Sequence, residues 1–369
     1  MNNAIFITGG CGFIGSNFIQ YILTNTEYRT VINLDKLTYA GNPNNLVDIQ
    51  KDDRYIFIQG DICDHNCVRN IFKEYNPNVV VHFAAESHVD RSIDGPQQFI
   101  QTNIIGTSVI LQESLDYYIH LNKVFRSKFK FHHISTDEVF GSLGEGGYFS
   151  ESTAYDPSSP YSASKASSDH LVRAWHRTFG LPVTISNCSN NYGPYQFPEK
   201  LIPLMILNCL TEKPLPVYGT GENVRDWLYV LDHCDAINMV LQKGTIGETY
   251  NVGGNNEIKN IQIVKNICTI LDEVKPAESG EYYHQLITFV KDRPGHDFRY
   301  AINSKKIKQD LGWQPQETFQ SGLRKTINWY LDNKDWWIET QKNIYQQDRL
   351  GTVKPGLIKT FSFLLFFLF

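Results

Sequence analysis

Three polar residues meet at the end of a hydrophobic segment, in HHISTDEVFG at residues 132–141. Thr136, Asp137 and Glu138 follow a run that predicts a buried strand, where charge is costly to bury. One interpretation is a helix N-cap, with the threonine as cap and the two acids in the first turn. The other is a site that needs an acid and a base side by side. Burial and the neighbouring like charge should then keep one carboxyl protonated near neutral pH.

A tyrosine and a lysine stand four residues apart in SSPYSASK, near the start of a predicted helix. Positions i and i+4 share one face of a helix, so Tyr161 and Lys165 are neighbours there. An ammonium near a phenol favours the phenolate, so we expect a lowered pKa for Tyr161. Such a tyrosine can remove a hydroxyl proton while hydride leaves the same carbon. Alone, the pair is also typical of an ordinary helix surface.

A glycine-rich turn, TGGCGFIG at residues 8–15, follows the first predicted strand and opens the first helix. Gly9, Gly12 and Gly15 let the backbone turn tightly and approach a pyrophosphate, which a helix N-terminus favours electrostatically. Asp35 ends the second predicted strand, and a carboxylate there accepts bonds from the ribose of NAD and repels the extra phosphate of NADP. The strand, turn, helix and acid together predict NAD binding.

Short apolar strands alternate with helical stretches through the first half of the chain. We expect strands at 4–8, 30–34, 55–60, 79–84, 130–135 and 183–188, and helices at 13–25, 65–75, 97–120 and 161–179. This alternation predicts an α/β fold, a Rossmann-like doubly wound parallel sheet whose ligands bind at the carboxyl ends of the strands. The opening stretch, HHISTDEVFG, falls at one of these ends.

The pattern becomes less regular after residue 188, where Pro and Gly recur. We therefore expect an NAD-binding domain over 1–188, with a return segment at about 226–252. A smaller mixed C-terminal substrate domain is expected over 189–350. Residues 351–369 form a hydrophobic tail, too short to span a bilayer, whose role is open between docking, weak membrane association and none.

Composition excludes several classes of protein. A net charge of −5 and a pI near 6.1 offer no basic field to a nucleic acid. Seven scattered cysteines without a CxxC pair predict neither a disulfide framework nor a zinc site, and favour a reduced, cytoplasmic protein. We expect no metal site, and we expect His82, His132 and His133 to be core histidines within strands. Apart from the tail, no membrane association is expected.

Longer motifs carry a resemblance to a known family. TGGCGFIGSNF, DKLTYAGN, AAESHVDRSI, ISTDEVFG, SPYSASKASSDHLVRAW, NNYGPYQFPEKLIP, RDWLYV and DRPGHDFRYAI extend over roughly residues 3–345. In these motifs the chain resembles the extended short-chain dehydrogenase/reductase superfamily and, within it, the dTDP-glucose 4,6-dehydratase family. Phe140, where that family usually has a second tyrosine, and the hydrophobic tail are the departures.

The resemblance implies a lyase that uses NAD to dehydrate dTDP-glucose to dTDP-4-keto-6-deoxy-glucose, a step of deoxysugar biosynthesis. Oxidation at C4 acidifies the C5 proton, water leaves from C5 and C6, and hydride returns to C6. By the family pattern, Asp137 is the acid at C6 and Glu138 the base at C5. Thr136 bonds the C4 oxygen, from which Tyr161 removes the proton, with Lys165 beside it.

The resemblance also implies the binding residues. The NAD-binding set comprises Gly9, Gly12, Phe13, Ile14, Gly15, Asp35, Lys36, Leu37, Thr38, Asp61, Ile62, Ala84, Ala85, Thr102, Tyr161, Lys165 and Asn191. The substrate-binding set comprises Ser87, Thr136, Asn190, Glu199, Lys200, Leu201, Pro216, Val217, Tyr218, Arg225, Asn260, Asp292, Arg293, Pro294, Gly295 and His296. Arginines suit a diphosphate because they grip it through paired donors. A homodimer built from the helices near 97–120 and 161–179 is a family expectation.

Three alternatives stay open. A dehydratase of a UDP-linked or other nucleotide sugar would share nearly every motif. A nucleotide-sugar 4-epimerase returns hydride to C4 and needs no acid and base for C5 and C6, so Asp137 and Glu138 argue against it. A non-catalytic NAD-binding protein would have little need for the five catalytic candidates together.

Overall fold

A computed structural model describes residues 3–292 and 295–344 of the chain. Its centre is a seven-stranded sheet in the order β10-β6-β5-β4-β1-β2-β3, with every neighbouring pair parallel. The predicted doubly wound parallel sheet is therefore confirmed. The strands are β1 (Ala4–Thr8), β2 (Thr30–Asp35), β3 (Tyr55–Gln59), β4 (Val79–His82), β5 (Lys130–Thr136), β6 (Val183–Cys188) and β10 (Thr249–Val252).

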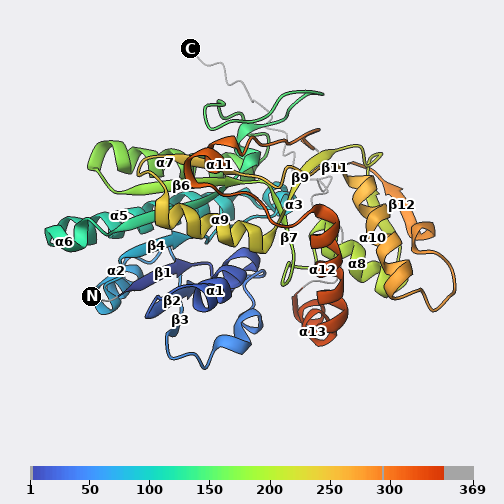
Figure 1. The fold of residues 1–369 in the computed structure, drawn as a ribbon, viewed down its shortest axis with the longest axis horizontal. Coiled ribbons are helices and arrows are strands. Elements are labelled where there is room, and N and C mark those ends of the chain that lie inside the picture. The colour runs from blue at the N-terminus through green and yellow to red at the C-terminus, as the bar shows by residue number, and fades with distance from the viewer. Residues whose placement is uncertain (1–2, 293–294, 345–369) are drawn as a thin grey trace, which may run out of the picture.

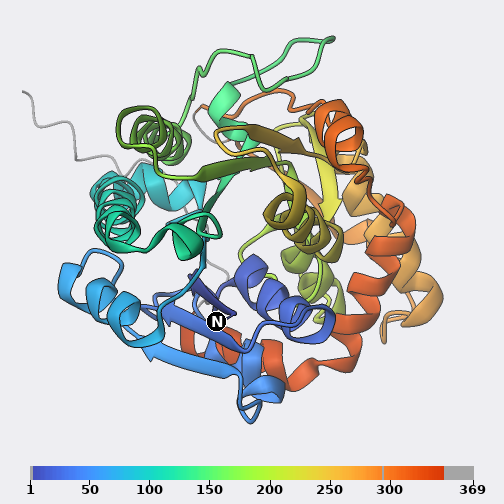
Figure 2. The same ribbon diagram turned by 60° about the vertical axis from the view of Figure 1, so that its left-hand side comes forward.

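Helices cover both faces of this sheet (Figures 1 and 2). On one face, Val68, Val109 and Val172 pack with strand residues of the sheet. They belong to helices α2 (His65–Tyr75), α5 (Thr107–His120) and α7 (Pro160–Phe179). On the other face, Phe18 and Ile237 pack with further strand residues, from helices α1 (Phe13–Asn25) and α9 (Val230–Lys243). Burial on both faces explains why these strands are continuously apolar.

A second hydrophobic core lies beside the large sheet, toward the right of Figure 1. It joins helices α8 (Leu201–Leu210), α10 (Asn260–Val274), α12 (Phe319–Asp332) and α13 (Lys334–Ile344) to two small sheets. One sheet has the order β11-β9-β7, from Glu257–Lys259, Val224–Tyr229 and Asn190–Tyr192, and the other pairs β12 (Ile287–Val290) with β8 (Leu215–Tyr218). The division of the chain into domains at residue 188 stays a prediction.

The helical stretch expected near 97–120 contains a wide turn. It runs through α4 (Pro96–Phe99), a π-helical segment η2 (Ile100–Gly106) and then α5. Short π-helical segments are frequently found at functional sites. Here the segment directs Asn103 to bond the backbone of Glu86 through both atoms of its amide.

The remaining elements are short and connect the larger ones. They are η1 (Pro43–Ile49), α3 (Val89–Asp94), α6 (Lys123–Arg126), η3 (Asp137–Phe140), η4 (Tyr283–Leu286) and α11 (Lys305–Leu311). Over 3–292 and 295–344, no helix is both long and apolar enough to cross a bilayer. The hydrophobic tail at 351–369 lies outside the described residues.

Four histidines are buried in or beside the large sheet. His82 bonds the hydroxyls of Thr8 and Thr107, and His132 lies between those of Thr184 and Ser186. Burial lowers the pKa of His132 and His233 to about 3 and that of His133 to about 4, and it holds the pKa of His82 well below its usual range. All four are therefore neutral in the folded protein.

This predicts a loss of stability as pH falls below about 6.5, the ordinary histidine pKa. The four imidazoles take up protons only on unfolding. Asp137 and Asp226 have raised pKa values in the folded protein, so they release up to about two protons on unfolding and partly offset this uptake. The net uptake approaches about two protons, or about 3 kcal/mol per pH unit, only near pH 5.5, so stability should change little between pH 7.5 and 6.5 and fall below that. Urea unfolding at pH 7.5, 6.5 and 5.5 measures the slope. Stability that is constant over this range would contradict the prediction.

Candidate active site

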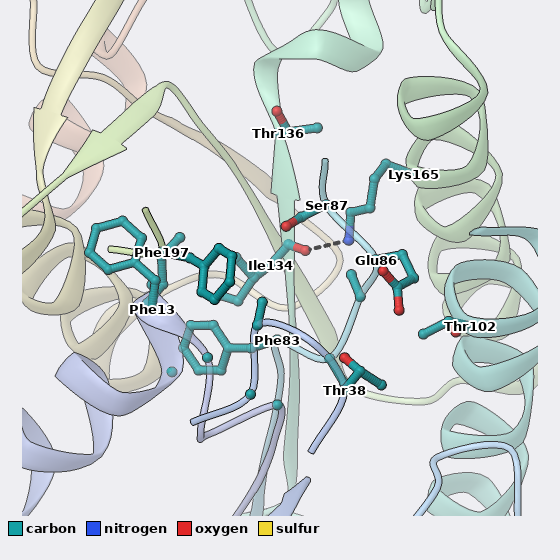
Figure 3. Close-up of a pocket in the computed structure, with 18 of the residues that line it drawn as sticks. Phe13, Thr38, Phe83, Glu86, Ser87, Thr102, Ile134, Thr136, Lys165 and Phe197 are labelled. Atoms are coloured by element: carbon teal, nitrogen blue, oxygen red, sulfur yellow. Dashed lines mark hydrogen bonds between the residues drawn. The ribbon is translucent and has the colours of Figure 1, made fainter. Parts of the chain in front are cut away.

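The carboxyl ends of β1, β2, β4, β5 and β6 converge on one cavity of about 300 Å³. Parallel strands all end at the same edge of a sheet, so the motifs that follow them meet there. The lining draws on the glycine turn after β1, the segment after β2, the loop after β4, the triplet after β5 and the start of α7. Figure 3 shows Phe13, Thr38, Glu86, Thr136 and Lys165 around this space.

The glycine turn is packed too closely for side chains. Gly9 has a φ of +74°, and a Cβ there would lie 2.6 Å from the backbone nitrogen of Ala84. A Cβ on Gly15 would lie 2.3 Å from the carbonyl oxygen of Gly9. Helix α1 starts at Phe13 without a side-chain cap, and its first residues, Phe13 to Gly15, line the cavity. This geometry fits a pyrophosphate.

Asp35 is held beside the turn, and each of its carboxylate oxygens accepts one hydrogen bond from a backbone N–H. Oδ2 accepts a 2.8 Å bond from the N–H of Cys11, and Oδ1 accepts one of 2.8 Å from the N–H of Leu37. A carboxylate oxygen has a further lone pair, so both oxygens can still accept a ribose hydroxyl. At the rim, Lys36 pairs with Asp61 at 2.7 Å. The turn and the acid together fit the adenosine half of NAD.

Of the predicted NAD-binding residues, the structure brings all but one to the cavity wall. The exception is Leu37, whose φ of +57° turns the chain after β2 and whose N–H bonds Asp35. The five catalytic candidates, Thr136, Asp137, Glu138, Tyr161 and Lys165, all line the same cavity.

The triplet after β5 forms a capped 3₁₀ turn. Thr136 is the N-cap of η3, and its hydroxyl accepts a 3.2 Å bond from the N–H of Glu138. The N-cap interpretation is therefore correct as local geometry, and the same turn directs Asp137 and Glu138 into the cavity. Capping and a role in the site are compatible, because the cap fixes where the two acids lie.

Asp137 is a buried carboxyl without full hydrogen bonding. Its Oδ2 has no protein partner within the described residues. Burial raises its pKa well above the usual range, and the neighbouring charge of Glu138 raises it further. The expectation of one protonated carboxyl is met by Asp137, which is thus suited to donate a proton to a ligand.

The expected lowering of the Tyr161 pKa is wrong for this structure. The phenol is buried, and burial followed by the charge of Glu138 raises its pKa well above 10. Lys165 sits on the same face of α7, but its ammonium donates a 2.8 Å bond to the carbonyl oxygen of Ile134 (Figure 3). The four-residue spacing correctly predicted that Tyr161 and Lys165 share a helix face, but it could not show which group the Lys165 ammonium binds.

The predicted substrate residues divide into two groups. Ser87, Thr136, Asn190, Glu199 and Lys200 line the cavity. The others lie away from its wall, around β8, β9 and the starts of α8 and α10: Leu201, Pro216, Val217, Tyr218, Arg225, Asn260, Asp292, Gly295 and His296. Arg293 and Pro294 lie outside the described residues.

Arg225 connects this second group to the catalytic acids. Its guanidinium lies 4.0 Å from the ring centre of Tyr300 and bonds the carbonyl oxygens of Val224 and Asp297. The charge of Arg225 opposes the rise in the Asp137 pKa, and that of Glu138 raises the pKa of Tyr300. Coulombic interaction weakens with distance, so these effects indicate that Arg225 and Tyr300 lie near the two acids.

Sequence reasoning missed several residues of the site. Tyr39, Glu86, Cys188 and Phe197 line the cavity, and Tyr300 lies near Glu138. Four of the five stand inside motifs quoted above, so the signal was present without a role attached to it. Arg91 is also new, since its guanidinium covers the Tyr39 ring at 3.8 Å and binds Glu199 at 2.9 Å. Within the described ranges, no group of three His, Cys, Asp or Glu side chains could hold a metal ion.

Comparison with known proteins agrees with this site. Residues 6–326 match the family model described as GDP-mannose 4,6 dehydratase. A dTDP-glucose 4,6-dehydratase from Escherichia coli is 57% identical over 362 residues, which cover 95% of this chain and 99% of that protein.

Solved structures give the same result. A dTDP-glucose 4,6-dehydratase from Bacillus anthracis in complex with NAD is 47% identical, with a TM-score of 0.81, over 91% of this chain and 99% of that one. A UDP-glucose 4-epimerase from Thermotoga maritima reaches a TM-score of 0.78 at 28% identity, over 90% of this chain and 99% of that one. The fold is shared by both enzymes, whereas the identity favours the dehydratase. The chain belongs to the dTDP-glucose 4,6-dehydratase family of the short-chain dehydrogenase/reductase superfamily.

Proposed function

We propose that this chain is an NAD-dependent lyase that converts dTDP-glucose to dTDP-4-keto-6-deoxy-glucose and water. The observation that carries the proposal is the shared cavity. A protonated buried carboxyl, a second carboxyl one residue away and a tyrosine line the same space as a dinucleotide-binding turn. An epimerase of this fold needs the turn and the tyrosine but has no use for the two acids.

Bound NAD would supply the hydride acceptor for C4 and the hydride donor for C6, and its oxidised ring would add positive charge to the site. Tyr161 takes the proton from the C4 hydroxyl during oxidation, and Thr136 holds the same oxygen by a hydrogen bond. The phenol starts protonated because burial, followed by the charge of Glu138, raises its pKa. It therefore acts as a base only when positive charge, from Lys165 and the cofactor ring, offsets this rise.

Elimination then uses the two acids on neighbouring carbons. Glu138 removes the C5 proton, which the C4 ketone has made acidic. Asp137 gives its proton to the C6 hydroxyl, which leaves as water. The burial that keeps Asp137 protonated therefore supplies the acid at neutral pH.

The nucleotide of the substrate extends toward the second core. We assign the diphosphate to Arg225 and Arg293, because guanidinium groups bind phosphate through paired donors. Ser87, Asn190, Glu199 and Lys200 face the sugar and the base. Since Glu199 is held by Arg91, its orientation is fixed before the substrate arrives.

We also propose a cytoplasmic homodimer. The seven cysteines are unpaired, which suits a reducing compartment. Large apolar side chains stand exposed on neighbouring helices, with Ile100 and Ile105 on η2, Ile119 on α5 and Phe179 on α7. Exposed apolar groups on adjoining elements are typical of an interface.

Incubation with dTDP-glucose and NAD in deuterated water tests the function. Mass spectrometry should show a sugar nucleotide that has lost one water and carries solvent deuterium, since the C5 proton exchanges through Glu138. No NADH should accumulate, because the hydride returns to the product. An unchanged dTDP-glucose together with epimerised UDP-glucose would replace the proposal by a 4-epimerase.

Glu138→Gln and Asp137→Asn should separate the steps. With Glu138→Gln we expect loss of deuterium incorporation while oxidation at C4 continues. With Asp137→Asn we expect water loss to slow about 100-fold or more, and C4 oxidation to slow less. Rapid-quench mass spectrometry in deuterated water measures both steps. Equal loss of every step in two folded variants would refute the separate roles.

Light scattering tests the dimer. The wild-type chain should have twice its mass of 42.4 kDa in solution. Ile105→Arg places a charge on the proposed interface and should shift the protein toward the monomer. Val47→Arg, at a somewhat more exposed position on η1, is the matched control and should remain dimeric. A monomeric wild type would refute the assembly.

A further inference from the structure

A buried carboxylate lies on the side of Lys165 that faces away from the cavity. Asp169 follows Lys165 by four residues on α7, so Tyr161, Lys165 and Asp169 share one face of that helix. Oδ2 of Asp169 accepts bonds of 2.8 Å from the Ser135 hydroxyl and 2.7 Å from the Tyr155 hydroxyl. Asp169 does not line the cavity, and the reaction proposed above gives it no role.

His133 stands between this carboxylate and the lysine. Its Nε2 is 3.3 Å from Oδ1 of Asp169 and 3.5 Å from the Nζ of Lys165. The Lys165 ammonium can only donate and the Asp169 carboxylate can only accept, so the tautomer of His133 decides which of the two Nε2 bonds. Burial lowers the imidazole pKa to about 4, so His133 is neutral and the two charged ends are the ammonium and the carboxylate.

Lys165 needs such a partner because it is fully enclosed. Burial lowers its pKa, and among the charges acting on it the Asp169 carboxylate opposes this most. The pKa of Asp169 itself is held below its usual range by His133, Lys165 and Tyr155. The titratable groups facing the pair are His82 on β4, His133 on β5, Asp137 and Glu138 on η3, Tyr155 before α7, Tyr161 and Arg173 on α7, and Cys188 on β6.

We propose that Asp169 is a positioning residue for the reaction, whose buried negative charge, acting past the neutral His133, keeps Lys165 a cation and anchored on the Ile134 carbonyl. Lys165 can then supply the positive charge that Tyr161 requires to act as a base. The inference rests on the proposed function for its catalytic consequence, but the charge of Lys165 can be tested without it.

The pH dependence of kcat separates this role from a purely structural one. Asp169→Asn keeps the size of the side chain and removes its charge. We expect the alkaline limb of the profile, which reports the loss of the Lys165 proton, to move down by about one pH unit or more. Tyr155→Phe removes a hydrogen bond from the same carboxylate without changing any charge, so its profile should keep the wild-type shape. Equal profiles for Asp169→Asn and wild type would overturn the proposal.

Competitive labelling provides a readout that is independent of turnover. A short pulse of acetic anhydride modifies only unprotonated amines, and peptide mass spectrometry gives the labelled fraction of Lys165 relative to an exposed lysine such as Lys265. In the wild-type protein, we expect Lys165 to resist labelling at pH 7.5 although the cavity reaches it. In Asp169→Asn, labelling should begin about one pH unit lower than in the wild type.

The two measurements distinguish the possible failures. Ready labelling of wild-type Lys165 at pH 7.5 would overturn the inference even if Asp169→Asn does not fold. If Lys165 resists labelling but the protein converts no nucleotide sugar, the proposed function would be refuted and the pairing of Lys165 with Asp169 would stand. A variant that labels like wild type would show that Asp169 serves the packing of α7 alone.

Discussion

Two carboxyl groups on adjacent residues cannot both carry charge at the bottom of a buried cavity, and this constraint organises the site. Asp137 is enclosed more completely than Glu138 and therefore takes the proton. The 3₁₀ turn capped by Thr136 fixes both acids at the end of β5. An acid and a base are thus produced from similar side chains by the difference in their surroundings alone.

The charges of neighbouring groups also set the protonation states of side chains on helix α7. Burial, followed by the negative charge of Glu138, raises the pKa of Tyr161 and favours its neutral form. A base at that position requires positive charge, and the chain supplies it through Lys165 on the next turn of α7. That ammonium is itself buried, and the Asp169 carboxylate one turn further along is the charge that most opposes the cost of burying it. On this face of α7, Tyr161 needs the positive charge of Lys165 to act as a base, and buried Lys165 is stabilised by the negative charge of Asp169.

The sequence predicted the large sheet and the cavity well because both follow from local patterns. Apolar strands alternating with helices define a parallel sheet, and its edge must gather Gly9, Asp35, Thr136 and Tyr161. The pKa of Tyr161 could not be predicted, since it depends on how deeply the fold buries the phenol and on the neighbouring charge of Glu138. Tyr300 and Arg91 were missed because their neighbours, Glu138 and Tyr39, are far away in the sequence. The placement of Arg225 beside Asp137 likewise follows from packing between distant segments.

The central claim is that Asp137 is a neutral acid at physiological pH. Infrared difference spectroscopy of the wild-type protein against Asp137→Asn, recorded from pH 6 to 9, observes the carbonyl stretch of a protonated carboxyl directly. The account predicts such a band in the wild type at pH 7, absent from the variant and lost only at higher pH. A wild-type spectrum without the band at pH 7, in a folded protein, would mean that Asp137 is ionised and would contradict the account.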